Sequence, residues 1–101
     1  MRDIHEEISQ LLRDHHIVLF MKGTPVFPQC GFSSQVVAIL KEYDVEYHPI
    51  NVLQDDEVRQ GIKEFGNWPT IPQLYVDGQL IGGCDIITSM HENEELSKVF
   101  S

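Results

Sequence analysis

The sequence predicts an α/β fold, in which helices flank both faces of a four-stranded mixed sheet. Three observations predict it: an apolar run at 17–21, apolar residues at helical spacing between the predicted strands, and an Asp77-Gly78 pair between two apolar triplets. Strands joined through a helix are expected to be parallel, and strands joined by a two-residue turn to be antiparallel. The 101 residues fit a single domain, 1–101, around one core.

The first half of the chain predicts two helices and a buried strand. Apolar residues between 4 and 12 recur at helical spacing among acidic and polar ones, which indicates a surface helix. The run 17–21 includes β-branched residues and predicts a strand that is buried on both faces. A loop rich in Gly and Pro at 23–28 then leads to Cys30. Because 32–43 again has a helical period, we expect Cys30 at a helix N-terminus.

A second strand is predicted over 45–52, where Pro49 indicates an edge strand or an irregularity. The next helix opens at Asp55, in a run of acids that suits the helix dipole, and stops near Gly66. Its apolar face contains Val58, Ile62 and Phe65.

The second half closes with a hairpin and a helix. Residues 74–76 and 79–81 flank Asp77-Gly78, a strong hairpin signal, and 85–100 has helical character with an interruption near Asn93. The resulting order is α-β-α-β-α-β-β-α. With a cysteine at the first strand-to-helix turn, this order favours the thioredoxin-like fold.

Composition narrows the function classes. The net charge of −9 repels nucleic-acid phosphates, and no basic stripe offsets it, so we expect no nucleic-acid partner. No apolar run approaches the length of a membrane span. Two distant cysteines do not form the disulfide framework of a small secreted domain, and the N-terminus resembles neither a signal nor a transit peptide. We therefore expect a cytoplasmic protein.

The segment Cys30-Gly31-Phe32-Ser33 places a hydroxyl where a Cys-x-x-Cys pair has its second sulfur. A serine oxygen is too weak a nucleophile to resolve a mixed disulfide. Cys30 therefore needs a borrowed thiol for redox chemistry, or it serves as a ligand of an iron-sulfur cluster. Its helix N-terminus, with Lys22 nearby, favours the thiolate.

Three stretches carry a family resemblance: Lys22-Gly23-Thr24-Pro25 before Cys30-Gly31-Phe32-Ser33, then Trp68-Pro69-Thr70-Ile71-Pro72-Gln73, then Gly82-Gly83-Cys84-Asp85. Together they resemble a monothiol glutaredoxin of the Cys-Gly-Phe-Ser class, in its single-domain form. The resemblance runs over nearly the whole chain. It implies a thioredoxin-like fold, glutathione binding and a 2Fe-2S cluster that bridges two subunits.

The resemblance also assigns the site residues. It makes Cys30 the catalytic thiol and the metal ligand. It implies a cis peptide bond before Pro72, so that the main chain of Ile71 binds the cysteinyl part of glutathione while the Ile71 side chain stays in the core. Lys22 and Arg59 are expected to hold the glycyl carboxylate.

The start of the last helix is expected to bind the γ-glutamyl end of glutathione. Helix N-terminal N–H groups bind carboxylates, and Asp85 can pair with the γ-glutamyl amino group or cap the helix. For Cys84 three interpretations stay open: a second redox thiol, a disulfide partner of Cys30, or a small, partly buried residue beside the groove. We favour the third, with main-chain binding as its function.

Three functions are compatible with these residues. A 2Fe-2S cluster takes four ligands and one chain offers one, so two Cys30 thiolates and two glutathiones would build a cluster-bridged homodimer. We favour such a carrier in iron-sulfur cluster assembly, storage or transfer to recipient proteins. The alternative is a glutathione-dependent thiol-disulfide oxidoreductase with Cys30 as nucleophile, an enzyme activity that we expect to be weak. The third is an adaptor that binds a BolA-type protein.

Overall fold

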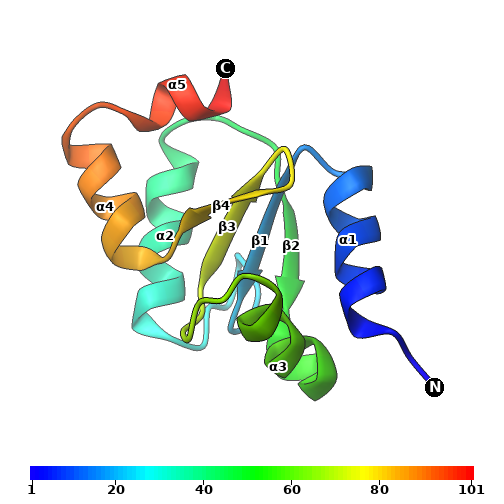
Figure 1. Ribbon diagram of the computed structural model, residues 1–101. Helices are drawn as coiled ribbons and strands as arrows, with labels where there is room; N and C mark the ends of the chain where they lie inside the picture. The colour runs from blue at the N-terminus through cyan, green and yellow to red at the C-terminus, as the bar shows by residue number, and fades with distance from the viewer.

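A computed structural model describes residues 1–101 and shows helices packed on both faces of one sheet (Figure 1). The elements are α1 (Ile4–Asp14), β1 (Ile17–Met21), α2 (Gly31–Lys41), β2 (His48–Asn51), the 3₁₀ helix η1 (Val52–Gln54), α3 (Asp56–Phe65), β3 (Gln73–Val76), β4 (Gln79–Gly82), α4 (Cys84–Glu92) and α5 (Leu96–Phe100). The predicted order and fold class are confirmed.

The sheet is mixed, with strand order β2-β1-β3-β4. Strand β1 is parallel to β2, with Val18 opposite His48, and antiparallel to β3, with Leu19 opposite Leu74. Strands β3 and β4 form the antiparallel hairpin. Pro49 lies on the edge strand β2, as its missing N–H donor predicts.

Strand β1 divides the core into two halves. Its side chains alternate: Ile17, Leu19 and Met21 face α2 and α4, while Val18 and Phe20 face α1 and α3. All five residues are buried, which confirms a strand covered on both faces. Figure 1 shows the same layers, with α1 and α3 on one side of the sheet and α2 and α4 on the other.

The second strand is shorter than the predicted 45–52. It begins at His48 and ends at Asn51, and Val52 starts the 3₁₀ helix. Val45 and Tyr47 are half-buried against the core without pairing to β1. The apolar residues before His48 are therefore packed against the core without belonging to the strand, because pairing with β1 begins only at Val18, opposite His48.

The turn signals are confirmed. Asp77 and Gly78 have φ values of 52° and 78°, and positive φ at both central residues is the type I′ geometry that a two-residue hairpin needs. The tail also breaks where expected, because α4 ends before Asn93 and α5 begins at Leu96.

The loop after β1 is folded tightly on itself. The Gln29 N–H donates to the Lys22 carbonyl at 2.9 Å, and the Gly23 N–H donates to Asn51 Oδ1 at 2.9 Å. Gly23 has φ of +91°, and a Cβ there would lie 2.5 Å from the Phe27 carbonyl oxygen. Only glycine fits this position, and the turn it permits returns the chain to the start of α2.

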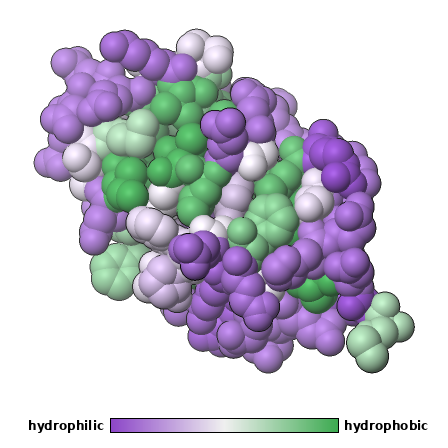
Figure 2. Space-filling model, viewed as in Figure 1, coloured by the Kyte–Doolittle hydropathy of each residue, from purple (hydrophilic) through white to green (hydrophobic).

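The molecular surface is mostly polar on the face seen in Figure 2, where apolar residues show through in two larger patches and a few smaller ones. No helix is both long and apolar enough to span a membrane.

Candidate functional site

A groove of about 410 Å³ lies where β1 ends and α2 and α4 begin. Its walls come from five parts of the chain: the end of β1, the start of α2, α3, the loop before β3, and the start of α4. The lining residues are Lys22, Cys30, Phe32, Lys63, Trp68, Pro69, Thr70, Ile71, Pro72, Gly83, Cys84, Asp85 and Ile86. All three stretches that carry the resemblance thus meet in one cavity.

Cys30 is the N-cap residue of α2, as predicted, and is partly exposed in the groove. The backbone N–H of Ser33 is the main cause that lowers the pKa of the Cys30 thiol. The backbone N–H of Phe32 and the charge of Lys22 lower this pKa further, while partial burial opposes them. The helix start therefore stabilises the thiolate at Cys30.

Ser33, three residues after the thiol, is fully buried. Its Oγ accepts a hydrogen bond of 3.1 Å from the Lys22 N–H, which ties the end of β1 to the first turn of α2. The hydroxyl also makes a minor contribution to the lowered pKa of Cys30. Ser33 thus has a structural role, because it fixes the position of Lys22 relative to the start of α2, where Cys30 lies.

The Ile71-Pro72 peptide bond is cis, as the resemblance implied. Ile71 lines the groove, yet its side chain is buried in the core half formed with α1 and α3. Ile71 therefore has its side chain in the core, as expected, and lies in the groove wall.

Helix α4 begins directly at the groove. Gly83 is its N-cap and supplies no side-chain bond to the first turn, where Asp85 is exposed. Cys84 is 9% exposed, lines the groove, and has its Sγ 4.0 Å from Thr88 Oγ1. Both cysteines are free, so this structure contains no Cys30–Cys84 disulfide. Asp85 does not cap the helix through its side chain.

The positively charged residues that line the groove differ from the expected pair, Lys22 and Arg59. Arg59 and Lys63 lie on α3 one turn apart, but Lys63 lines the groove and Arg59 does not. The Arg59 Nε atom is buried without a hydrogen-bond partner. The structure thus brings Lys22, Cys30, Ile71, Cys84 and Asp85 together and leaves Arg59 outside the lining.

Comparison with known proteins decides the family. The glutaredoxin family model matches residues 17–81. A probable monothiol glutaredoxin 2 of Rickettsia typhi is 50% identical over 92 residues, which are 91% of this chain and 83% of that protein. The chain belongs to the monothiol glutaredoxins.

Other monothiol glutaredoxins contain the same unit within longer chains or show the same fold. Monothiol glutaredoxin-S11 of Oryza sativa subsp. japonica is 52% identical over 97 residues, which are 96% of this chain but only 20% of the rice protein. The solution structure of reduced poplar apo GrxS14 matches with a TM-score of 0.80 and 46% identity, over 92% of this chain and 85% of that one. These likenesses confirm the thioredoxin-like glutaredoxin fold.

Two features of this monothiol glutaredoxin's groove were not predicted. Lys63 was missed, although its spacing of four residues from Arg59 on one helix was the available signal. Phe32 begins the helical period predicted over 32–43, which left open whether it packs in the core or covers the site; it is 60% exposed and lines the groove. Phe32 lies on the same side of α2 as the buried Val36 and Leu40, but in the first turn, where the helix borders the groove.

We expect the Cys30 thiol of this monothiol glutaredoxin to titrate below the ordinary cysteine value of about 8.5. The test follows the rate of iodoacetamide alkylation against pH in a Cys84→Ser background. Lys22→Met should raise the midpoint only in part, because backbone N–H groups are the larger cause. A midpoint at or above 8.5 in the otherwise unchanged protein would contradict the expectation.

Proposed function

We propose that this monothiol glutaredoxin binds glutathione in the groove and that two copies hold a 2Fe-2S cluster for transfer to recipient iron-sulfur proteins. One observation carries the proposal: the groove holds a single partly exposed thiol with a lowered pKa, and the position three residues on is a buried serine. Such a thiol can ligate or attack, but it has no neighbour in its own motif to resolve a disulfide.

The charges of the groove support glutathione as the ligand. At neutral pH glutathione has two carboxylates, one ammonium group and a thiol. Lys22 and Lys63 supply cations from two walls, and the start of α4 supplies N–H groups together with the Asp85 carboxylate. Each charge of glutathione thus has a partner of opposite sign among the lining residues.

The ligand count supports a site shared between two chains. A 2Fe-2S cluster needs four ligands, and no group of three or more His, Cys, Asp or Glu side chains in this chain could hold a metal ion. Two Cys30 thiolates and two glutathione thiolates complete the set of four. Because two of these ligands are small molecules, the cluster is held as exchangeable cargo at a subunit seam.

The test is anaerobic reconstitution with iron, sulfide and glutathione, read by visible absorption and by size-exclusion chromatography. We expect absorption in the visible range and a dimer to appear together, and both to be absent when glutathione is omitted. A monomer without visible absorption under complete conditions would rule out the carrier function.

A second function, glutathione-dependent oxidoreductase, is favoured by the lowered pKa of Cys30. In the first step the Cys30 thiolate attacks the glutathione sulfur of a glutathionylated protein, forms a Cys30-glutathione disulfide and releases the protein thiolate. A second glutathione thiolate then attacks that disulfide, which releases oxidised glutathione and restores the Cys30 thiolate. Turnover by the chain without iron, coupled to a glutathione-regenerating system, would favour this function.

A BolA-type partner and a cytoplasmic location stay predictions.

A further inference from the structure

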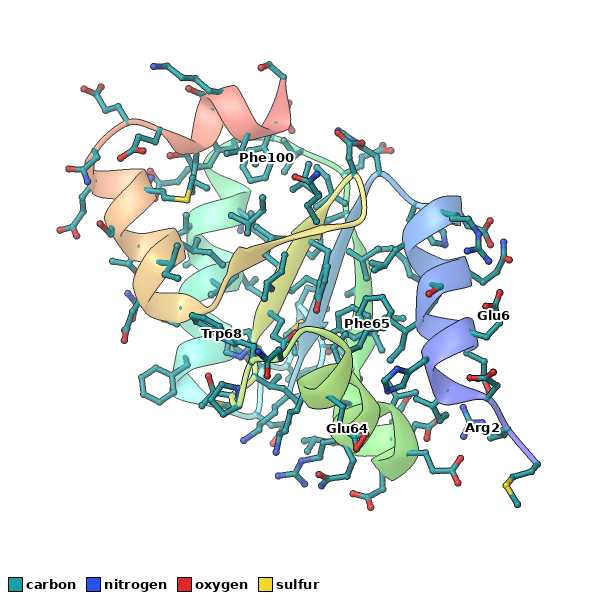
Figure 3. All side chains as sticks on the ribbon, in the orientation of Figure 1. Arg2, Glu6, Glu64, Phe65, Trp68 and Phe100 are labelled. Atoms are coloured by element: carbon teal, nitrogen blue, oxygen red, sulfur yellow. The ribbon has the colours of Figure 1, made fainter.

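The groove wall formed by the loop before β3 has little hydrogen bonding of its own. Residues 68–71 line the groove consecutively and belong to no helix or strand, and Figure 3 shows Trp68 beside the start of α4. Among the backbone–backbone hydrogen bonds of the turns and loops, none involves residues 69–71. Apart from the Trp68 N–H, which donates to the Lys63 carbonyl at 3.0 Å, the main chain of this wall depends on hydrogen bonds from side chains.

Gln73, the first residue of β3, supplies those contacts. Its side chain is fully buried, one of only two buried polar residues in the chain. The Gln73 Nε2 group donates to the Trp68 carbonyl at 3.1 Å and to the Thr70 carbonyl at 3.2 Å. One buried amide thus holds the main chain on both sides of Pro69 from beneath the groove.

Tyr75 fixes the orientation of that amide. The Tyr75 hydroxyl donates to Gln73 Oε1 at 2.9 Å, so the amide oxygen is occupied and both N–H donors point at the loop. Burial raises the pKa of Tyr75 to about 12, so the hydroxyl keeps its proton at neutral pH. The Tyr75 ring is itself held by Phe20, edge to face, with ring centroids 5.6 Å apart.

Gly66 leaves room for this arrangement. A Cβ at Gly66 would collide with the Tyr75 hydroxyl and would lie 2.9 Å from Gln73 Oε1. The Gln73 amide is therefore closely packed against the end of α3, and no side chain could be added at Gly66.

We propose that Gln73 is a positioning residue, which acts through the Trp68 and Thr70 carbonyls to hold the groove wall in its ligand-binding shape. The expected effect on affinity rests on the proposed function, the binding of glutathione in the groove. It assigns to a buried residue, outside the groove lining, part of the groove's affinity for its ligand.

The test compares Tyr75→Phe with the double variant Gln73→Met, Tyr75→Phe. Tyr75→Phe removes the hydroxyl but leaves both donors to the loop. The double variant has a similar volume and removes the donors, and it leaves no buried tyrosine hydroxyl without a partner. Two readouts are used: glutathione affinity by calorimetry, and acrylamide quenching of Trp68, the only tryptophan of the chain.

We expect the double variant to raise the glutathione dissociation constant about five- to tenfold over Tyr75→Phe, which corresponds to the loss of one or two hydrogen bonds. Quenching of Trp68 should rise more in the double variant than in Tyr75→Phe, where the amide loses the hydrogen bond that orients it but keeps both donors to the loop. Should the double variant fail to fold, the double variant Gln73→Leu, Tyr75→Phe gives the same test, because leucine also removes the donors to the loop without burying a charge.

A destabilised control separates positioning from general loss of stability. Leu96→Ala empties a buried site in the core half on the other face of the sheet and should leave affinity and quenching unchanged. Equal affinity and quenching in Tyr75→Phe and the double variant would overturn the positioning role. If the unchanged protein does not bind glutathione, the proposed function fails, and the Trp68 quenching still decides whether Gln73 holds the wall.

Discussion

Replacing Cys30 by serine is expected to abolish the visible absorption and the dimer together after anaerobic reconstitution. Cys30 is the partly exposed thiol of the groove, and the start of α2 stabilises its thiolate. A serine hydroxyl stays protonated at neutral pH and is a poor ligand for iron in a cluster. Because the proposed cluster joins the two copies, the loss of one ligand per chain should remove both signals. Absorption and size-exclusion chromatography measure the two in one sample.

Cys84→Ser is the matched control for this expectation. Cys84 lies in the same groove but is 9% exposed, and it is free in the structure. We expect this variant to keep both the absorption and the dimer. The opposite pattern, in which Cys84→Ser loses the signals and Cys30→Ser keeps them, would make Cys84 the ligand and contradict the assignment.

Phe20→Ala is expected to give the largest loss of stability among single core truncations near the site, about 3–5 kcal/mol in the free energy of unfolding. Phe20 is fully buried on β1 and packs against the Tyr75 ring. Its removal leaves a cavity between the sheet and helices α1 and α3, in the core cluster that also contains Val18 and Ile71. A domain of this size is stable by about 5–15 kcal/mol, so the loss is a large part of the total. Urea unfolding followed by circular dichroism measures it.

Phe32→Ala removes the same side chain from an exposed position and serves as the comparison. Phe32 is 60% exposed at the groove rim, so its truncation should change the free energy of unfolding by less than about 0.5 kcal/mol. A similar loss in both variants would mean that Phe32 packs in the core, contrary to its position in the structure.

The fold could be predicted from sequence wherever local chemistry alone determines the geometry. Asp77 and Gly78 tolerate positive φ, so the hairpin and its tight turn follow from two residues. The start of β2 could not be predicted in this way. Val45 and Tyr47 are half-buried, and the sequence does not distinguish burial in a sheet from burial against a helix. The parallel pairing begins only at Val18 opposite His48, one residue after β1 starts, and the apolar pattern around His48 does not indicate this position.

The residues of the candidate site also differ in whether the local sequence could predict them. Cys30 at the start of α2 and the groove residues around Ile71 and Cys84 were identified from their motifs. Gln73 was not assigned a role, because its partners are two backbone carbonyls, and any loop could have supplied these. Lys63 and Arg59 share one face of α3, so spacing alone could not tell which one lines the groove.

The two outer strands of the sheet restrict how copies of this chain can associate. Pro49 removes an N–H donor from β2, and the ladder between β3 and β4 shifts register at Leu74/Tyr75. Both features weaken an exposed strand as a template for another chain. Growth of a continuous sheet across subunits, the usual route to fibrils in β-containing proteins, is thereby disfavoured. The proposed cluster-bridged dimer, which forms around the groove, does not depend on pairing between these edge strands.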